Sequence, residues 1–308
     1  MDMNNINDAD PFAGILDEIS TPASAVALKA GGGYSATINR SNPSCLIFVV
    51  DQSSSMDESF SGAKMKGEAV ADTVNKAIYS LVTRCTSADG CRAYFDIGVI
   101  GYGGDAATNA LAGPLGTVQL QSITEFERHP LRVEDRTLKI SDGAGGIVET
   151  KTKVPVWLEP RMSGGTPMCA AMRKVRDLVA DWCNNHPKSY PPTIIHITDG
   201  QSTDGNPEGL ANEIRELCTN DGNALIFNLH IDSGGASPIM FPTEVASVPD
   251  KHGRMLFRMS SVIPERLRPI AQERGYGVEL GSRFFGFNGD LVSLVQFIQI
   301  GSVAAQMR

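Results

Sequence analysis

The feature that most constrains the fold is the continuous apolar run at residues 45–50, CLIFVV. An apolar run rich in β-branched residues, with no polar alternation, is typical of a strand buried on both faces of a parallel sheet. The runs TIIHIT at 193–198 and ALIFNLHI at 224–231 repeat the pattern, and AYFDIGVIGYG at 93–103 predicts a further strand. We expect His196 and His230, which lie inside these strands, to form hydrogen bonds in the core. Strands of this kind need helices on both faces of their sheet.

The segments between the strands supply those helices. Residues 70–82 carry apolar side chains at helical spacing, and from Met168 to Trp182 the apolar residues form one stripe. A third segment, 210–217, has the same periodicity. Strands that alternate with helices predict an α/β fold: a doubly wound, mostly parallel sheet with helices on both faces.

Three weaker predictions concern the C-terminal part of the chain. RMLFRM at 254–259 favours a strand, PERLRPIAQERG at 264–275 a short helix, and DLVSLVQFIQIG at 290–301 a last helix. Residues 109–160 depart from the strand and helix rhythm, because alternating polar and apolar residues flank the Gly-rich segment DGAGG. That pattern predicts β-hairpins.

These observations predict one folded domain over residues 41–308. Residues 1–40, rich in Asn, Asp, Ser, Ala and Gly, form a flexible N-terminal extension or a strap over the domain. Residues 109–160 are a β-hairpin insertion, and residues 250–308 provide C-terminal elements that pack on the domain.

The formal net charge of −8 argues against nucleic-acid binding, because proteins that bind the phosphate backbone usually need a basic surface. The acidic start, MDMNNINDADPF, does not resemble a secretory signal, and the longest C-terminal apolar stretch is too short to cross a bilayer. In such a chain, scattered cysteines are expected to be reduced core residues, and Cys85 with Cys91 is the pair to test for a disulfide. We therefore expect a cytoplasmic protein with no membrane partner.

Oxygen-bearing side chains follow two of the buried strands. Asp51, Ser53 and Ser55 come directly after the strand at 45–50, and Asp199 follows the strand at 193–198. In an open parallel sheet, ligands bind beyond the carboxyl ends of the strands, so these side chains lie where a site is expected. Between them, Thr166 precedes Pro167 and has the features of a helix N-cap on an exposed loop.

Two carboxylates and three hydroxyls are hard oxygen ligands, which suit Mg²⁺, Mn²⁺ or Ca²⁺ and not Zn²⁺. Neutral hydroxyls leave much of the ion's charge uncompensated. An ion held in this way would accept one further carboxylate in place of a bound water, so the set predicts metal-dependent binding of an acidic group on a protein partner.

The ordered combination of D-x-S-x-S, a Gly-Gly-Thr loop and T-D-G resembles the metal-ion-dependent adhesion site of von Willebrand factor A domains. The resemblance covers about residues 45–232 and implies a Rossmann-like fold. It also implies that Ser53, Ser55 and Thr166 contact the metal directly, while Asp51 and Asp199 act partly through bound waters. GGTPM, HITDG and MSSVIPE look like bacterial cytoplasmic members related to tellurium-resistance proteins, which implies a kinase or phosphatase as a partner.

Other interpretations of the same residues are open. Asp51, Ser53 and Ser55 taken alone could form an ordinary hydrogen-bonded turn. A Mg²⁺-dependent phosphatase of the haloacid dehalogenase type also has an Asp after its first strand, but it needs a second Asp where Ser53 stands. A third possibility is a structural subunit of an ATPase-associated assembly. The favoured hypothesis is a protein that is not an enzyme and acts as a scaffold or regulator.

Overall fold

The computed structural model describes residues 33–61, 64–141, 147–231, 237–273 and 275–288. Its centre is an eight-stranded sheet with the order β15-β16-β14-β11-β1-β6-β7, in which β8 pairs with β6. The strands β6, β1, β11, β14 and β16 run parallel, whereas β7, β8 and β15 are antiparallel to their neighbours. Without β8 and β15, the spatial order is third, second, first, fourth, fifth and sixth along the chain. That order defines a doubly wound α/β fold and confirms the predicted class.

The strands of the main sheet are β1 (Ser44–Asp51), β6 (Phe95–Gly103), β7 (Ala106–Asn109), β8 (Gln121–Ser122), β11 (Thr193–Thr198), β14 (Leu225–His230), β15 (Ile239–Met240) and β16 (Phe285–Phe287). The α-helices are α2 (Lys66–Cys85), α3 (Ile123–Arg128), α4 (Met168–Asn185), α5 (Glu208–Glu216), α6 (Lys251–Met259) and α7 (Arg268–Glu273). Four 3₁₀ turns are η1 (Ser54–Asp57), η2 (Gly113–Thr117), η3 (Val245–Ser247) and η4 (Glu265–Leu267).

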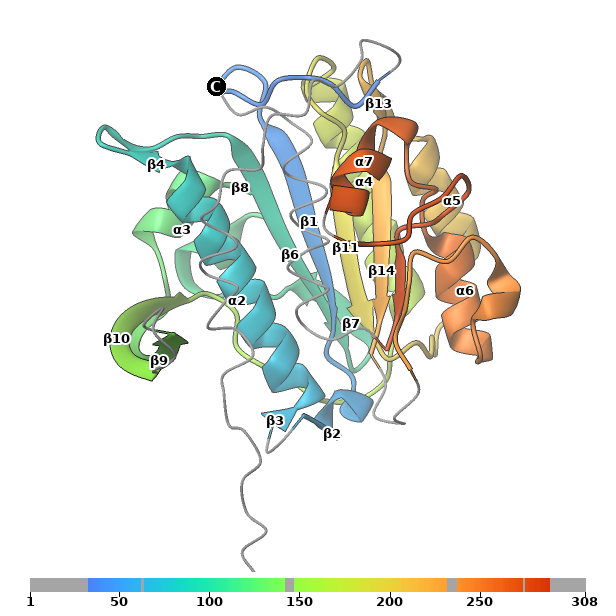
Figure 1. The fold of residues 1–308 in the computed structure, drawn as a ribbon, viewed down its shortest axis with the longest axis horizontal. Coiled ribbons are helices and arrows are strands. Elements are labelled where there is room, and N and C mark those ends of the chain that lie inside the picture. The colour runs from blue at the N-terminus through green and yellow to red at the C-terminus, as the bar shows by residue number, and fades with distance from the viewer. Residues whose placement is uncertain (1–32, 62–63, 142–146, 232–236, 274, 289–308) are drawn as a thin grey trace, which may run out of the picture.

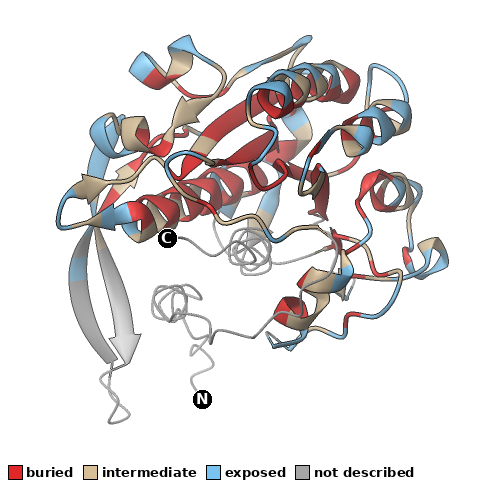
Figure 2. Ribbon diagram, turned by 90° about the horizontal axis from the view of Figure 1, so that it is seen from above, coloured by how far each residue is buried: buried red, intermediate tan, exposed pale blue. Residues whose placement is uncertain are grey.

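Each face of the sheet has its own hydrophobic core. Alternate residues of β1 point to opposite faces, so Leu46 and Phe48 pack with α2, α3 and α7, while Ile47 and Val49 pack with α4, α5 and α6. Figure 1 shows α2 on one face of the sheet with α4 behind it, and Figure 2 shows the buried strands between these layers. Every residue of β1 is buried, as the continuous apolar run predicts.

Four small hairpins surround this sheet. They are β2 (Ser59–Ser61) with β3 (Lys64–Met65), β4 (Thr86–Ser87) with β5 (Gly90–Cys91), β9 (Arg132–Ser141) with β10 (Ile147–Val156), and β12 (Cys218–Thr219) with β13 (Gly222–Asn223). The β9–β10 hairpin lies within the predicted hairpin insertion, 109–160. The earlier part of that segment instead forms η2, the short strand β8 and α3. Helix α3 begins there because the Ser122 hydroxyl accepts a hydrogen bond from the Thr124 amide.

The C-terminal part differs from the sequence prediction at one element. RMLFRM, predicted as a strand, lies in α6. Asp250 caps this helix by accepting hydrogen bonds from the amides of His252 and Gly253, at 2.7 and 2.9 Å, and a β-carbon at Gly253 would lie 2.7 Å from the Val248 side chain. The predicted short helix is present as η4 and α7. The predicted last helix, 290–301, lies outside the described residues.

Of the expected extension or strap over residues 1–40, the structure describes residues 33–40, which contact the domain, and residues 1–32 lie outside the described part. Asp221 accepts hydrogen bonds from the amides of Ser35 and Ala36, at 2.8 and 2.9 Å. Ile38 is fully buried. This part of the extension is therefore a strap that is fixed to the domain, because one carboxylate satisfies two successive amides.

The six cysteines are free thiols. Four of them are buried, as expected for core residues, whereas Cys91 is half-buried and Cys218 is exposed. Among the helices in the described part of the chain, none is both long and apolar enough to span a membrane.

Asn75 of α2 fixes the chain where it returns from the β9–β10 hairpin toward the predicted site. Its side-chain oxygen accepts hydrogen bonds from the amides of Trp157 and Leu158, both at 2.9 Å, and its amide nitrogen donates to the Leu158 carbonyl at 2.9 Å. Asn75 is 3% exposed, so water cannot replace these bonds. The side chain of one residue therefore positions the segment that leads to Thr166.

We expect Asn75→Ala to lower the free energy of unfolding by about 2–4 kcal/mol, because it leaves two buried amides and a carbonyl without partners. Asn185→Ala is the matched control, since Asn185 is exposed and its side chain bonds only to the Asp181 carbonyl within α4. That control should change stability by no more than about 0.5 kcal/mol. Urea unfolding measures both, and equal effects would contradict the role given to Asn75.

Candidate metal centre

Asp51 is, together with Ser53, the most buried of the predicted ligands, and it joins two strands. Its side chain lies at the end of β1 and is 1% exposed. One carboxylate oxygen accepts a hydrogen bond from the Ser53 amide at 2.9 Å, and the other accepts one from the Thr198 hydroxyl at 2.7 Å. Burial raises the pKa of the Asp51 carboxyl to about 6; hydrogen bonds from Ser53 and Thr198 lower it, and the charge of Asp199 raises it. A cation beside this carboxylate would stabilise its charged form.

Ser53 and Ser55 present their hydroxyls to one another. The Ser53 and Ser55 oxygens lie 3.0 Å apart, and η1 holds them there by turning the chain directly after Ser53. The ligand oxygens of a six-coordinate Mg²⁺ lie about 2.1 Å from the ion, so adjacent ligands lie about 3 Å apart. The separation of the two hydroxyls fits two neighbouring positions around one such ion.

Asp199 lies next to Asp51 because their strands pair. Val50 of β1 is in register with Ile197 of β11, so the residues after these strands reach the same edge of the sheet. This edge lies between the first and fourth strands along the chain, where the strand order reverses and where doubly wound folds bind ligands. The charge of Asp199 raises the pKa of Asp51 because the two carboxylates are close.

Lys66 is a charged neighbour that the sequence analysis did not single out. Its ammonium lies 3.6 Å from an Asp199 carboxylate oxygen and 2.7 Å from a Glu58 oxygen, and the side chain is 3% exposed. Lys66 is the first residue of α2, where the positive end of the helix dipole disfavours a cation. A lysine at a helix start therefore needs acidic partners, and that is the signal in the sequence that could have found it.

The loop that carries Thr166 lies against the Asp51 loop. The Ser163 amide donates to the Gln52 carbonyl at 2.8 Å, and the Ser54 amide donates to the Gly164 carbonyl at 3.1 Å. Thr166 itself is 6% exposed. The long segment between β7 and α4 thus brings this loop back to the edge where Asp51 and Asp199 lie.

Thr166 is not the N-cap that the sequence predicts, because Pro167 occupies the N-cap position. The Pro167 side chain makes no capping hydrogen bond to the helix. Asp204 satisfies the first amides of α4 instead, since its carboxylate accepts from Cys169 and Ala170 at 2.8 and 2.9 Å. Within the described part of the chain, the Thr166 hydroxyl makes no hydrogen bond. The Thr166 hydroxyl is therefore available to a ligand.

A buried chain of hydrogen bonds joins β6, β11 and β14 next to the candidate metal centre. The Tyr102 hydroxyl lies 2.6 Å from His196 Nε2, and His196 Nδ1 lies 2.7 Å from the Asn228 side-chain oxygen. The Asn228 amide nitrogen donates to the Leu256 carbonyl, which fixes its oxygen toward the histidine. His196 Nδ1 is therefore the donor and Nε2 accepts from Tyr102. Burial lowers the pKa of His196 to about 4, so it is neutral, as a core histidine should be.

The described residues contain no group of three His, Cys, Asp or Glu side chains that could hold a metal ion. The predicted set has only two carboxylates and three hydroxyls, so it would not form such a group. The chemistry of the predicted set, Asp51, Ser53, Ser55, Thr166 and Asp199, fits a hard divalent ion.

No protein-family model matches the chain, and no curated protein matches its sequence. Among solved structures, the chain is similar to the pilus adhesin SpaC from Lactobacillus rhamnosus GG, with 15% identity over 88% of this chain and 31% of that one, and a TM-score of 0.45. It is also similar to the manganese-loaded TRAP protein from Plasmodium vivax, with 17% identity over 63% and 59% of the two chains and a TM-score of 0.35.

A third similar structure is the ArnB paralog VWA2 from Sulfolobus acidocaldarius, with 12% identity over 64% of this chain and 36% of that one, and a TM-score of 0.33. The chain spans between 31% and 59% of the length of these three solved chains. The fold class is established by the strand order and pairing of the sheet itself.

Gly164 allows the Thr166 loop to approach the turn between β6 and β7. Its φ angle is +70°, and a β-carbon there would lie 2.4 Å from the Gly104 α-carbon. Gly104 also has a positive φ, of +62°, but a β-carbon there would meet nothing within 4 Å. Both glycines therefore need a left-handed backbone conformation, but only Gly164 has no space for a β-carbon.

We expect Gly104→Ala to cost about 1–2 kcal/mol of stability, the cost of a left-handed backbone for an L-residue. Gly164→Ala should cost more, and it should also displace the Thr166 loop, because backbone atoms have to move. Thermal unfolding together with hydrogen exchange at the Ser54 and Ser163 amides measures both effects. Faster exchange in Gly164→Ala but not in Gly104→Ala is the expected result, and the same exchange in both variants would contradict it.

Proposed function

We propose that this edge of the sheet holds one divalent metal ion through Asp51, Ser53, Ser55, Thr166 and Asp199, and that the ion binds a carboxylate of a protein partner. The observation that carries the proposal is the pair of serine hydroxyls, 3.0 Å apart, beside a carboxylate that is 1% exposed. The donors are hard oxygens, so the ion is Mg²⁺, or else Mn²⁺ or Ca²⁺.

The charges of the described residues support an acidic partner. Three of the five donors are neutral hydroxyls, which leave positive charge on the ion. The Lys66 ammonium adds a further positive charge 3.6 Å from Asp199. An incoming carboxylate would meet both, and charge-assisted contacts of this kind are among the strong ones in proteins.

In this proposal the protein is a binding module and not an enzyme. A phosphatase of the haloacid dehalogenase type would use Asp51 as a nucleophile, and Lys66 is a cation that could serve such an enzyme. Both Asp51 oxygens accept hydrogen bonds, however, and the side chain is buried. This geometry suits a carboxylate that positions a metal shell better than one that attacks a phosphoester.

The wider setting belongs to the same proposal and rests on the motif resemblance. In this setting the protein is a scaffold or regulator in a bacterial cytoplasmic signalling or stress system of the tellurium-resistance-related type. Its partner is a kinase or a phosphatase. The alternative setting is a structural subunit of an ATPase-associated assembly. Size-exclusion chromatography of the native complex separates an assembly subunit from a free adaptor.

The proposal is tested first on the metal alone. Isothermal titration with MgCl₂ and MnCl₂ should give one site in the wild-type chain, and Ser53→Ala should weaken binding at least about tenfold, since a direct ligand is lost. Ser54→Ala is the matched control, because Ser54 is an exposed serine in the same loop and should bind metal as the wild type does. Equal metal affinity in the two variants would contradict the ligand set.

The partner is then sought in the native lysate with the same three proteins. A protein captured by the wild type and by Ser54→Ala, but lost with chelator or with Ser53→Ala, is the expected result. Capture that is unaffected by chelator and by Ser53→Ala would contradict the proposed mode of binding. Release of phosphate from p-nitrophenyl phosphate, abolished by Asp51→Asn, would favour the phosphatase instead.

The Lys66 ammonium and a divalent ion compete electrostatically for Asp199. We expect Lys66→Met to tighten metal binding roughly tenfold, because it removes a buried like charge close to the ion. Lys64→Met is the control, since Lys64 is 54% exposed on its side chain and pairs with Asp72. Isothermal titration measures the affinities, and a weaker or unchanged affinity in Lys66→Met would contradict this competition.

A further inference from the structure

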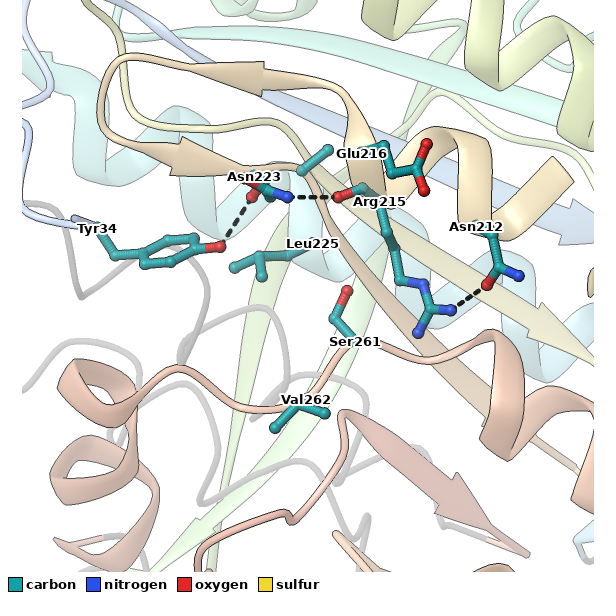
Figure 3. A pocket seen from close by; sticks show the side chains of 9 residues that line it. Tyr34, Asn212, Arg215, Glu216, Asn223, Leu225, Ser261 and Val262 are labelled. Carbon is teal, nitrogen blue, oxygen red and sulfur yellow. Dashed lines mark hydrogen bonds between the residues drawn. The ribbon is translucent and has the colours of Figure 1, made fainter. Parts of the chain in front are cut away.

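A second pocket lies at the opposite edge of the sheet from Asp51. It has a volume of about 370 Å³ and opens where β13 leads into β14, at the amino end of the parallel strands. Figure 1 places β13 at the upper edge of the molecule and the β2–β3 hairpin, next to the Asp51 loop, at the lower edge. Most of its lining side chains are polar, and Figure 3 shows them: Tyr34, Asn212, Arg215, Glu216, Asn223 and Ser261.

Arg215 is a half-buried cation in this pocket that forms no ion pair with the described residues. Its guanidinium donates to the Ser260 carbonyl at 2.8 Å and to the Asn212 side-chain oxygen. No carboxylate in the described part of the chain lies within ion-pair distance of it. Figure 3 shows the Glu216 carboxylate pointing away from the Arg215 guanidinium.

A second arginine, Arg283, lies near Arg215. Arg283 donates to the same Ser260 carbonyl at 2.6 Å, and its guanidinium lies over the Phe257 ring, 5.2 Å from the ring centre. Burial and then the charge of Arg283 lower the pKa of Arg215, whereas the charge of Glu216 raises it by a smaller amount. Two guanidiniums that share one neutral acceptor repel each other, and burying such charges without an anion is costly.

Ser261 provides a buried donor beside Arg215. It is 6% exposed, and its hydroxyl oxygen accepts a hydrogen bond from the Ile226 amide at 2.9 Å. Within the described residues the hydroxyl proton has no acceptor, and Figure 3 shows the hydroxyl directed into the pocket. A buried donor without an acceptor costs free energy that a bound acceptor would recover.

We propose that this pocket binds the oxyanion of a small ligand, a phosphate or a carboxylate, through the Arg215 guanidinium and the Ser261 hydroxyl. Arg283, which shares the Ser260 carbonyl with Arg215, contributes positive potential, and the pocket volume falls in the range of small-molecule sites. A guanidinium has a planar fork of donors that matches either oxyanion, and two donors from neighbouring elements fix its position.

The site is independent of the proposed metal centre. It lies at the other edge of the sheet and uses no metal ligand, so it is tested with chelator present. Failure of the metal proposal would leave this result unchanged, and the reverse also holds.

The test is an NMR titration of the full chain with inorganic phosphate and, separately, with acetate, each against chloride at equal ionic strength. We expect the side-chain Nε–H resonance of Arg215 to shift and saturate with at least one of the two anions. Arg215→Gln should weaken that binding at least tenfold, followed by the resonance of a neighbouring backbone amide. Arg176→Gln is the control, because Arg176 lies on α4 and pairs with Asp177 and Glu213.

The two anions decide which oxyanion the pocket prefers. No saturable shift of Arg215 with either anion would overturn the proposal, as would equal affinity in the wild type and Arg215→Gln. The wild-type titration decides the question by itself if Arg215→Gln does not fold.

Discussion

The carboxylate of Asp51, buried where β1 ends, is the constraint on which the candidate metal centre depends. It ties β1 to β11 through the Thr198 hydroxyl and orders the following loop through the Ser53 amide. Burying a carboxylate beside a second one, Asp199, is unfavourable unless positive charge is near. In the described structure that charge comes from Lys66, whose ammonium contacts Asp199.

The same electrostatic requirement links fold and function. The doubly wound strand order brings the ends of β1 and β11 together, and their termini carry like charges that a divalent ion would balance. Lys66 balances part of this charge from within the protein. In the proposed metal-bound form, a divalent ion would neutralise Asp199 in place of the Lys66 ammonium, so we expect Lys66 to oppose metal binding.

Much of this arrangement could be predicted from sequence because burial leaves a local pattern. A strand buried on both faces must be apolar throughout, so β1 and the residues that follow it were identifiable. Contacts between distant residues leave no such pattern: Asp204 caps α4 in place of Thr166, and Lys66 reaches Asp199 from another helix. Helix α6 was predicted as a strand for a different reason, because RMLFRM was interpreted without the local N-cap that Asp250 provides just before it.

The most direct measurement is anomalous diffraction from crystals of the full chain grown with MnCl₂. The account predicts one manganese peak at the carboxyl edge of β1 and β11, within roughly 2.0–2.4 Å of the Ser53 and Ser55 hydroxyl oxygens. Crystals saturated with manganese that show no peak at these two serines, or show one only elsewhere, would contradict it.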